Sequence, residues 1–188
     1  MSRQIGLRDV SFAKLLTDTS EGTTYDTVKK YERSISAKLT PKSSSENQYS
    51  DDSMEDVVSA FDSVEVEIEL NQLTPETRAF LQGAKVINGI LVESKNDIAP
   101  YVAMVFRSVK ANGKYRYVCL YKGKFELVAD NYETQSDKIK SQTATIKGTF
   151  MPRFDGNYRL IADEDATGAN ATALQAWLTT IPSIPVLS

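Results

Sequence analysis

Alternating apolar and polar residues predict extended strand over much of this chain. The strictest alternation lies in residues 63–70, where aliphatic side chains alternate with acids. The aliphatic set is Val64, Val66, Ile68 and Leu70, and the acidic set is Glu65, Glu67 and Glu69. Successive side chains of a strand point to opposite faces, so one face is expected in a core and the other carries a row of carboxylates. A looser alternation at 31–39, closed by Pro41, predicts another strand.

The longest apolar pattern spans residues 99–125 and is interrupted by Asn112 and Gly113. Asn-Gly between strand-like runs is typical of a two-residue type I′ hairpin turn, because both turn residues need a positive φ. A two-residue loop places Phe106 opposite Cys119. Both faces of such a hairpin carry apolar residues, so we expect other protein to cover it on both sides.

Two short helices are predicted among the strands. Thr74 is suited to be the N-cap of the first helix, and Gly83 to end it after about two turns. A second helix is predicted within 169–180, with Asn170 as its N-cap and apolar residues at spacings of three and four.

Further turn signals lie at 86–92, around Asn-Gly, and at 154–158, around Asp-Gly, and residues 143–150 alternate as a strand. The predicted strands and helices do not alternate regularly along the chain, as they would in a protein with a parallel sheet. The pattern therefore predicts a mainly β fold: an antiparallel β-sandwich or barrel with one or two short helices, in a single domain of residues 1–188.

Residues 42–56 form the longest stretch without a core-forming pattern. They are rich in serine and acids, and their only large apolar residues are Tyr49 and Met54. Long patternless segments in compact domains are usually functional or disordered. Two interpretations stay open for a loop or arm at about 40–57: a solvated mobile loop, or an arm that orders on a neighbouring subunit.

The composition removes several kinds of chemistry. The 188 residues suffice for one domain with a full core, and they include one cysteine and no histidine. The usual general base and metal ligand are therefore missing, a disulfide framework is excluded, and Cys119 has no histidine to activate it. The glycines in the segments NGI, NGK, KGK and DGN lie in predicted hairpin turns rather than before helices, so no phosphate-binding loop is recognisable. The acids at 163–165 lack the spacing of a calcium loop. We expect no cofactor and no metal.

No apolar signal sequence or membrane-spanning segment is recognisable, so the chain is expected to stay in the cytosol or to leave by lysis. The net charge of −3 does not favour sequence-independent binding of nucleic acid.

The row of Glu65, Glu67 and Glu69 allows three interpretations. A solvated strand face is the simplest one, and a face exposed to a polyanion that must not adhere is the second. The third is a glycosidase, which uses two carboxyl groups about 5 to 10 Å apart. No aromatic sugar-binding platform lies near these residues in the sequence, so the third is disfavoured.

Charge is segregated along the chain. No basic residue lies between Lys42 and Arg78, and no acid lies between Asp97 and Glu126. This segregation suits head-to-tail contact between identical subunits, which closes into rings or continues as filaments. The residues expected in such contacts are Arg107, Lys110, Lys114, Arg116, Tyr49, Asp51 and Asp52.

Two other interpretations of the basic hairpin stay open. Its lysines and arginines are interleaved with tyrosines, an arrangement that can hold single-stranded nucleic acid. Exposed lysines on edge strands also commonly prevent edge-to-edge aggregation of sheets.

Five segments carry a family resemblance. They are IGLRDVSFAKL, DTSEGTTYDT, VEIELNQLTPE, QTATIKGTF and, as the most specific block at 99–125, APYVAMVFRSVKANGKYRYVCLYKGKF. From about residue 5 to 150, the chain resembles the major tail protein, or tail tube protein, of long-tailed phages in the group often called the phi13 family. The segment 153–188 is less diagnostic of this family.

The resemblance implies a non-enzymatic structural subunit with a fold related to the type VI secretion tube protein. Six such subunits close a ring with an inner β-barrel, and rings stack around the tape-measure protein, with an arm reaching the adjacent ring. The tube later conducts double-stranded DNA during genome ejection, and it meets tail-tip and tail-terminator proteins. The implied location is the virion tail, assembled in the host cytoplasm without a membrane.

Within that picture, Glu65, Glu67 and Glu69 are hypothesised to face the lumen, where they would repel DNA phosphates. The alternative function is a β-sandwich module of a phage tail that binds carbohydrate or protein. Such a module would be monomeric and would show an exposed aromatic platform.

Overall fold

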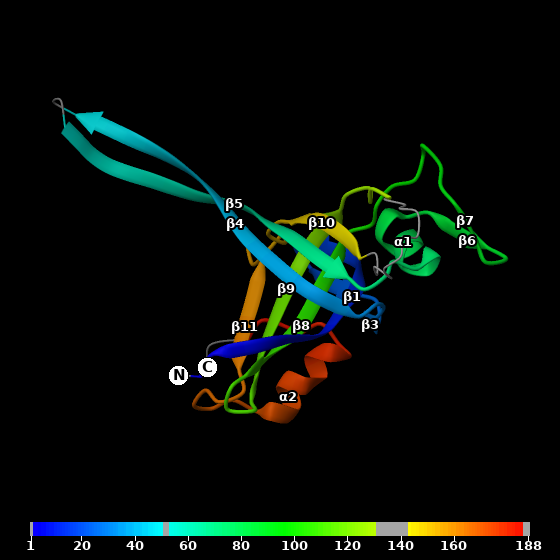
Figure 1. The fold of residues 1–188 in the computed structure, drawn as a ribbon. Coiled ribbons are helices and arrows are strands. Elements are labelled where there is room, and N and C mark those ends of the chain that lie inside the picture. Colours follow the sequence, from blue (N-terminus) through cyan, green and yellow to red (C-terminus); the bar gives the residue numbers. More distant parts are fainter. Residues whose placement is uncertain (1, 51–52, 131–142, 186–188) are drawn as a thin grey trace, which may run out of the picture.

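The computed structural model describes residues 2–50, 53–130 and 143–185, with the backbone alone at 45–50 and 53–59. The strands are β1 (Gln4–Thr19), β2 (Gly22–Tyr25), β3 (Lys29–Lys30), β4 (Ser34–Ser50), β5 (Ser53–Leu70), β6 (Lys85–Ile87), β7 (Ile90–Val92), β8 (Val102–Lys110), β9 (Tyr115–Phe125), β10 (Ala144–Phe150) and β11 (Arg159–Asp163). The helices are α1 (Pro75–Gln82), α2 (Ala171–Gln175) and the 3-10 helix η1 (Ala176–Leu178). The predicted mainly antiparallel β fold with two short helices is confirmed (Figure 1).

Nine strands share one antiparallel sheet. Its central path is β2-β1-β8-β9-β10-β5-β4, while β11 pairs with β9 and β3 pairs with β1. Side chains from β1, β5, β8, β9 and β10 meet in one core, which includes Phe12, Ile68, Leu120 and Phe150. The sheet therefore curves over its own apolar face, as Figure 1 shows where β4 and β5 cross the direction of β8 and β9.

The β8–β9 hairpin forms, but the predicted type I′ turn and its register are wrong. Gly113 has φ +79°, whereas Asn112 is not among the described residues with positive φ. The amide of Lys110 donates to the carbonyl of Lys114 at 2.8 Å, so the loop has three residues rather than two. Phe106 consequently pairs with Val118, and not with Cys119.

This register sorts the hairpin's side chains between two cores. Met104, Phe106 and Leu120 enter the main core, whereas Val105, Cys119 and Tyr121 form a second one. A one-residue slip exchanges the faces of a strand, so burial of both faces fixes the pairing more strongly than the turn sequence does.

The second core lies beneath the C-terminal segment. Trp177, Leu178 and Ile181 pack on the outer face of the hairpin, and the hydroxyl of Tyr121 donates to the carbonyl of Pro182 at 3.0 Å. The expectation that protein covers both faces is confirmed. Asn170 caps α2 as predicted, although regular helix ends at Gln175 and continues as η1.

Residues 63–70 of β5 keep the predicted alternation, with Val64, Val66, Ile68 and Leu70 in the core. Strand β4 does not end at Pro41, which pairs with Val64 and is followed by nine more strand residues. Strand β4 is the last strand of the sheet path, so proline's missing N–H interrupts no further ladder.

The stretch 42–56 lies largely in a β-ladder rather than an irregular loop. On the N-terminal side of Ser63, β5 pairs only with β4 among the described strands. Residues 43–62 of these two strands form a two-stranded arm. Figure 1 shows the arm in cyan, extending away from the body. At its base, Phe61 stacks on Tyr158 with ring centroids 4.1 Å apart.

The remaining turn signals had mixed outcomes. Thr74 and Gly83 cap α1 as predicted, and the Asn-Gly turn between β6 and β7 has positive φ at both residues. The turn near Asp155 also forms, but β10 and β11 do not pair with each other. Both lie against β9, on successive parts of its length.

Candidate assembly surfaces

The carboxylates of Glu65, Glu67 and Glu69 lie on the outer face of β5, between β4 and β10. Lys38 and Lys147 are the neighbours of Glu67 across the two ladders. This face therefore carries charges of both signs. The sequence of β5 alone does not show this, because the lysines come from the neighbouring strands.

Each glutamate of this row has a polar neighbour. Lys42 Nζ lies 3.2 Å from a carboxylate oxygen of Glu65, and Lys147 Nζ lies 3.8 Å from one of Glu67. Thr143 Oγ1 donates to Glu69 at 2.9 Å. We call this surface, formed by β4, β5 and β10, the charge-ladder face.

A shallow groove of about 300 Å³ runs along the charge-ladder face, and its lining includes Lys38, Glu65, Glu67 and Glu126. No aromatic ring is among the described residues that line it. Glu65 and Glu67 are both exposed to solvent rather than enclosed in a cleft. The geometry therefore does not favour the glycosidase interpretation.

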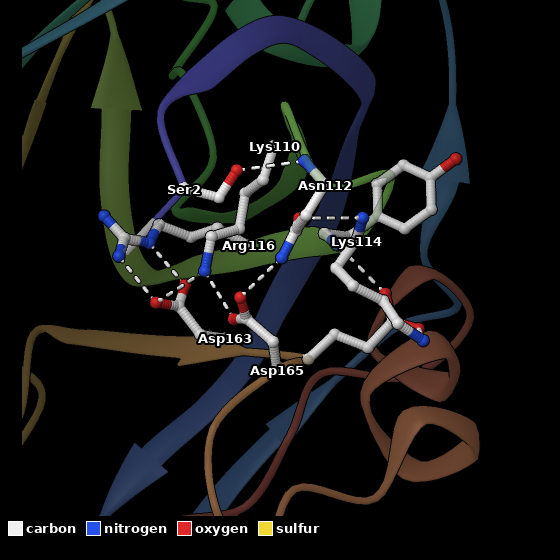
Figure 2. Close-up of polar contacts among 9 residues, drawn as sticks. Ser2, Lys110, Asn112, Lys114, Arg116, Asp163 and Asp165 are labelled. Atoms are coloured by element: carbon white, nitrogen blue, oxygen red, sulfur yellow. Dashed lines mark hydrogen bonds and ion pairs between the residues drawn. The ribbon is translucent and has the colours of Figure 1, made fainter.

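The basic residues of the β8–β9 hairpin meet acids of their own chain. Figure 2 shows Lys110 and Arg116 facing Asp163, the last residue of β11, and Asp165, two residues after it. Lys110 Nζ contacts Asp165 and lies 3.2 Å from Asp163, and only 4% of Lys110 is exposed. Arg116 forms a bidentate ion pair with Asp163, in which one guanidinium nitrogen lies 2.6 Å from a carboxylate oxygen.

This hairpin-tip cluster also includes the chain's start. Asn112 Nδ2 donates to Asp165 at 2.8 Å, and the amide of Asn112 donates to Ser2 Oγ at 2.9 Å (Figure 2). The hydrogen bond from Arg116, followed by that from Lys110, lowers the pKa of Asp163 to about 2. The contact with Asp165 raises the pKa of Lys110. The cluster joins three segments that lie far apart in the sequence.

The other hairpin cations have partners too. Lys114 lies 3.5 Å from Glu164, and Arg107 donates to Asp9 at 2.6 Å. Asp9 occupies a bulge of β1 with φ +56°, and this conformation interrupts the alternation of that strand. These two pairs were missed in the sequence because 50 residues separate Lys114 from Glu164 and 98 separate Arg107 from Asp9.

These contacts bear on the expected inter-subunit residues. Arg107, Lys110, Lys114 and Arg116 each have an acidic partner in their own chain, so their role between subunits stays a prediction. The side chain of Tyr49 and the residues Asp51 and Asp52 lie outside the described part of the chain.

Two further observations concern ligands and membranes. Burial raises the pKa of the Cys119 thiol. Within residues 2–50, 53–130 and 143–185, no cluster of three metal-ligating side chains occurs, and no helix is long and apolar enough to cross a membrane.

Comparison with known proteins identifies the family. A search of curated proteins found no match. The family model described as phage tail tube protein matches residues 17–178, from the end of β1 to the end of η1. The match includes Trp177 and Leu178, which cover the second core, and so extends into the C-terminal part in which the sequence resemblance is weak. The chain therefore belongs to the phage tail tube protein family and is a structural protein of a phage tail.

Proposed function

We propose that six copies of this chain form a ring and that rings stack around a tape-measure protein into the conduit for genome ejection. The observation that carries the proposal is the open sheet edge of β4 together with the arm that continues it. Among the described strands, β4 pairs only with β5. An exposed edge favours pairing with another chain, and closing a ring of subunits removes such edges.

Assembly of the purified chain tests this proposal. Negative-stain microscopy and light scattering over a range of protein and salt concentrations should show rings or tubes. A chain that stays monomeric even with its tape-measure and tail-tip proteins would contradict the proposal and favour a tail-borne binding module. Tail-terminator protein should cap the tubes, which we place in the virion after assembly in the host cytoplasm.

We further propose that the charge-ladder face lines the lumen. Its lysines and glutamates nearly balance, so DNA phosphates meet neither a strong attraction nor a continuous repulsion. A DNA duplex that the wall binds weakly along its whole length can slide. Lysines without acidic partners would instead bind the phosphates tightly, because counterions are released from the DNA.

Charge reversal at Glu65, Glu67 and Glu69 tests the lumen assignment. We expect the triple lysine variant to assemble but to slow genome ejection severalfold, with the largest effect at low salt, because cations would hold the phosphates. The triple glutamine variant is the control for loss of the ion pairs. Normal ejection by particles of the lysine variant would exclude the lumen role.

A further inference from the structure

The chain contains two Asn-Gly dipeptides, Asn88-Gly89 and Asn112-Gly113, and both are exposed in hairpin turns. This dipeptide is chemically labile, because a glycine has no side chain to keep its amide nitrogen away from the side-chain amide of the preceding asparagine. Attack by that nitrogen deamidates the asparagine. Sequence and exposure alone give the two sites the same reactivity, and their hydrogen bonds distinguish them.

The asparagine of the β8–β9 turn is held at both polar atoms of its side chain. Asn112 Nδ2 donates to Asp165 at 2.8 Å, and Asn112 Oδ1 accepts from the amide of Lys114 at 3.2 Å. The amide of Gly113, which would have to attack, donates to the carbonyl of Lys110 at 2.9 Å. Deamidation here requires these hydrogen bonds to break together, so this turn is protected.

The turn at Asp155-Gly156 can close the same kind of ring and is held in the same way. The carboxylate of Asp155 accepts from Arg153 and, at 3.0 Å, from the amide of Asn157. The amide of Gly156 donates to the carbonyl of Arg153 at 3.0 Å. Both the group to be attacked and the attacking nitrogen are therefore engaged.

The asparagine of the β6–β7 turn is free by comparison. Within residues 2–50, 53–130 and 143–185, neither the side chain of Asn88 nor the amide of Gly89 has a hydrogen-bond partner. A Cβ added at Gly89 would meet no atom within 4 Å. Neither hydrogen bonds nor packing thus oppose a change of conformation at this turn.

The ribbon that carries this turn is also the weaker hairpin. Strands β6 and β7 have three residues each and form a sheet of their own, whereas β8 and β9 have nine and eleven residues and belong to the main sheet. On one face of the ribbon, Ile87, Ile90 and Val92 are 47% to 66% exposed. A short two-stranded ribbon opens locally at little cost in free energy. Opening frees Asn88 from its left-handed conformation, φ +51°, and lets it reach the geometry of attack.

We propose that Asn88 is a site of spontaneous deamidation in the folded protein. The amide nitrogen of Gly89 loses its proton and bonds to Cγ of Asn88, and the bond from Cγ to Nδ2 breaks with release of ammonia. Water then opens the cyclic imide at either carbonyl, which leaves aspartate or isoaspartate. The sequence of steps consumes one water and needs no cofactor.

The product changes the end of the ribbon. A new carboxylate lies beside Ile87 and Ile90, which pair across the turn, and it makes the net charge of −3 more negative by one. Isoaspartate also adds a methylene to the backbone of a two-residue turn, whose geometry depends on its length. Ageing of the protein therefore alters an exposed apolar face at a defined residue.

Mass spectrometry of the incubated full chain tests the proposal. Cleavage after arginine gives the peptide 79–107, which contains Asn88, and the peptide 108–116, which contains Asn112. In the folded chain we expect acid to form at Asn88 at least about tenfold faster than at Asn112, because only the β6–β7 turn opens easily. The rate at Asn88 should rise with pH, since the attacking amide must lose its proton.

Incubation in urea is the internal control. Unfolding removes the hydrogen bonds that protect Asn112, so the two rates should then agree within about threefold. Equal rates in the folded chain, faster reaction at Asn112, or reaction only in urea would each overturn the proposal.

The variant Asn88→Gln identifies the reacting residue. Glutamine closes a larger ring far more slowly, so peptide 79–107 of this variant should remain unmodified under the same conditions. Acid that still forms in this peptide would come from another residue, such as Asn96, and would contradict the assignment to Asn88.

Discussion

At the scale of single residues, the hairpin-tip cluster shows what sequence reasoning misses. The basic run of the hairpin and the acids at 163–165 are both evident in the sequence, but their pairing requires β11 to lie along β9. That neighbourhood has no local signal, because β11 follows β10 in the chain and pairs instead with a strand about 40 residues earlier. Cations assigned to contacts between subunits thus also have partners within their own chain.

Asp163 gives this cluster a pH dependence. Its pKa lies at about 2 instead of the ordinary 3.8, because Arg116 and Lys110 stabilise the ionised form. A carboxyl whose pKa is lowered by folding stabilises the native state above pH 4, and this contribution is lost as the pH falls towards 2. Acid should therefore weaken the attachment of the hairpin tip.

We predict that Asp163→Asn lowers the free energy of unfolding by about 1–2 kcal/mol at pH 7, as expected for a lost hydrogen bond between charged groups. The difference from wild type should shrink as the pH approaches 2. Denaturant titrations of the unassembled chain at several pH values measure it. Asp62→Asn, which removes an exposed acid, is the control and should have little effect. An Asp163→Asn deficit that is independent of pH would contradict this account.

At the scale of elements, prediction succeeds where local chemistry is sufficient. Thr74 and Gly83 specify the two ends of α1, and the Asn-Gly turn of β6–β7 takes the conformation its residues favour. The same dipeptide fails at 112–113 because burial of both hairpin faces selects another register. A loop or arm at about 40–57 was expected from the sequence, but its β-ladder was not, because no apolar alternation accompanies it.

Gly83 provides a test of how the end of α1 packs on the segment that precedes β8. Gly83→Ala should destabilise the chain by about 3 kcal/mol or more, because the Cβ would collide with the backbone of Ile98. Gly168→Ala is the matched control: Gly168 also has a positive φ, but its Cβ would meet open space, so about 1 kcal/mol is expected. Thermal unfolding of both variants measures the difference. Equal losses would show that the close approach to Ile98 contributes nothing.

At the scale of the whole molecule, the family was recognisable from quoted segments, above all from residues 99–125, and the family match confirms it. The fold class followed from alternation and turn signals. The surfaces could not be predicted from the sequence in the same way. The charge-ladder face is assembled from three strands, and its balance of charge depends on how those strands are paired in register. The relation to the type VI secretion tube protein stays a prediction.

The most direct measurement is a cryo-electron microscopy reconstruction of the assembled protein. The account predicts a hollow tube of stacked six-membered rings, with β4, β5 and β10 lining the lumen. A reconstruction with no continuous lumen, or with the charge-ladder face on the outside of the tube, would contradict it.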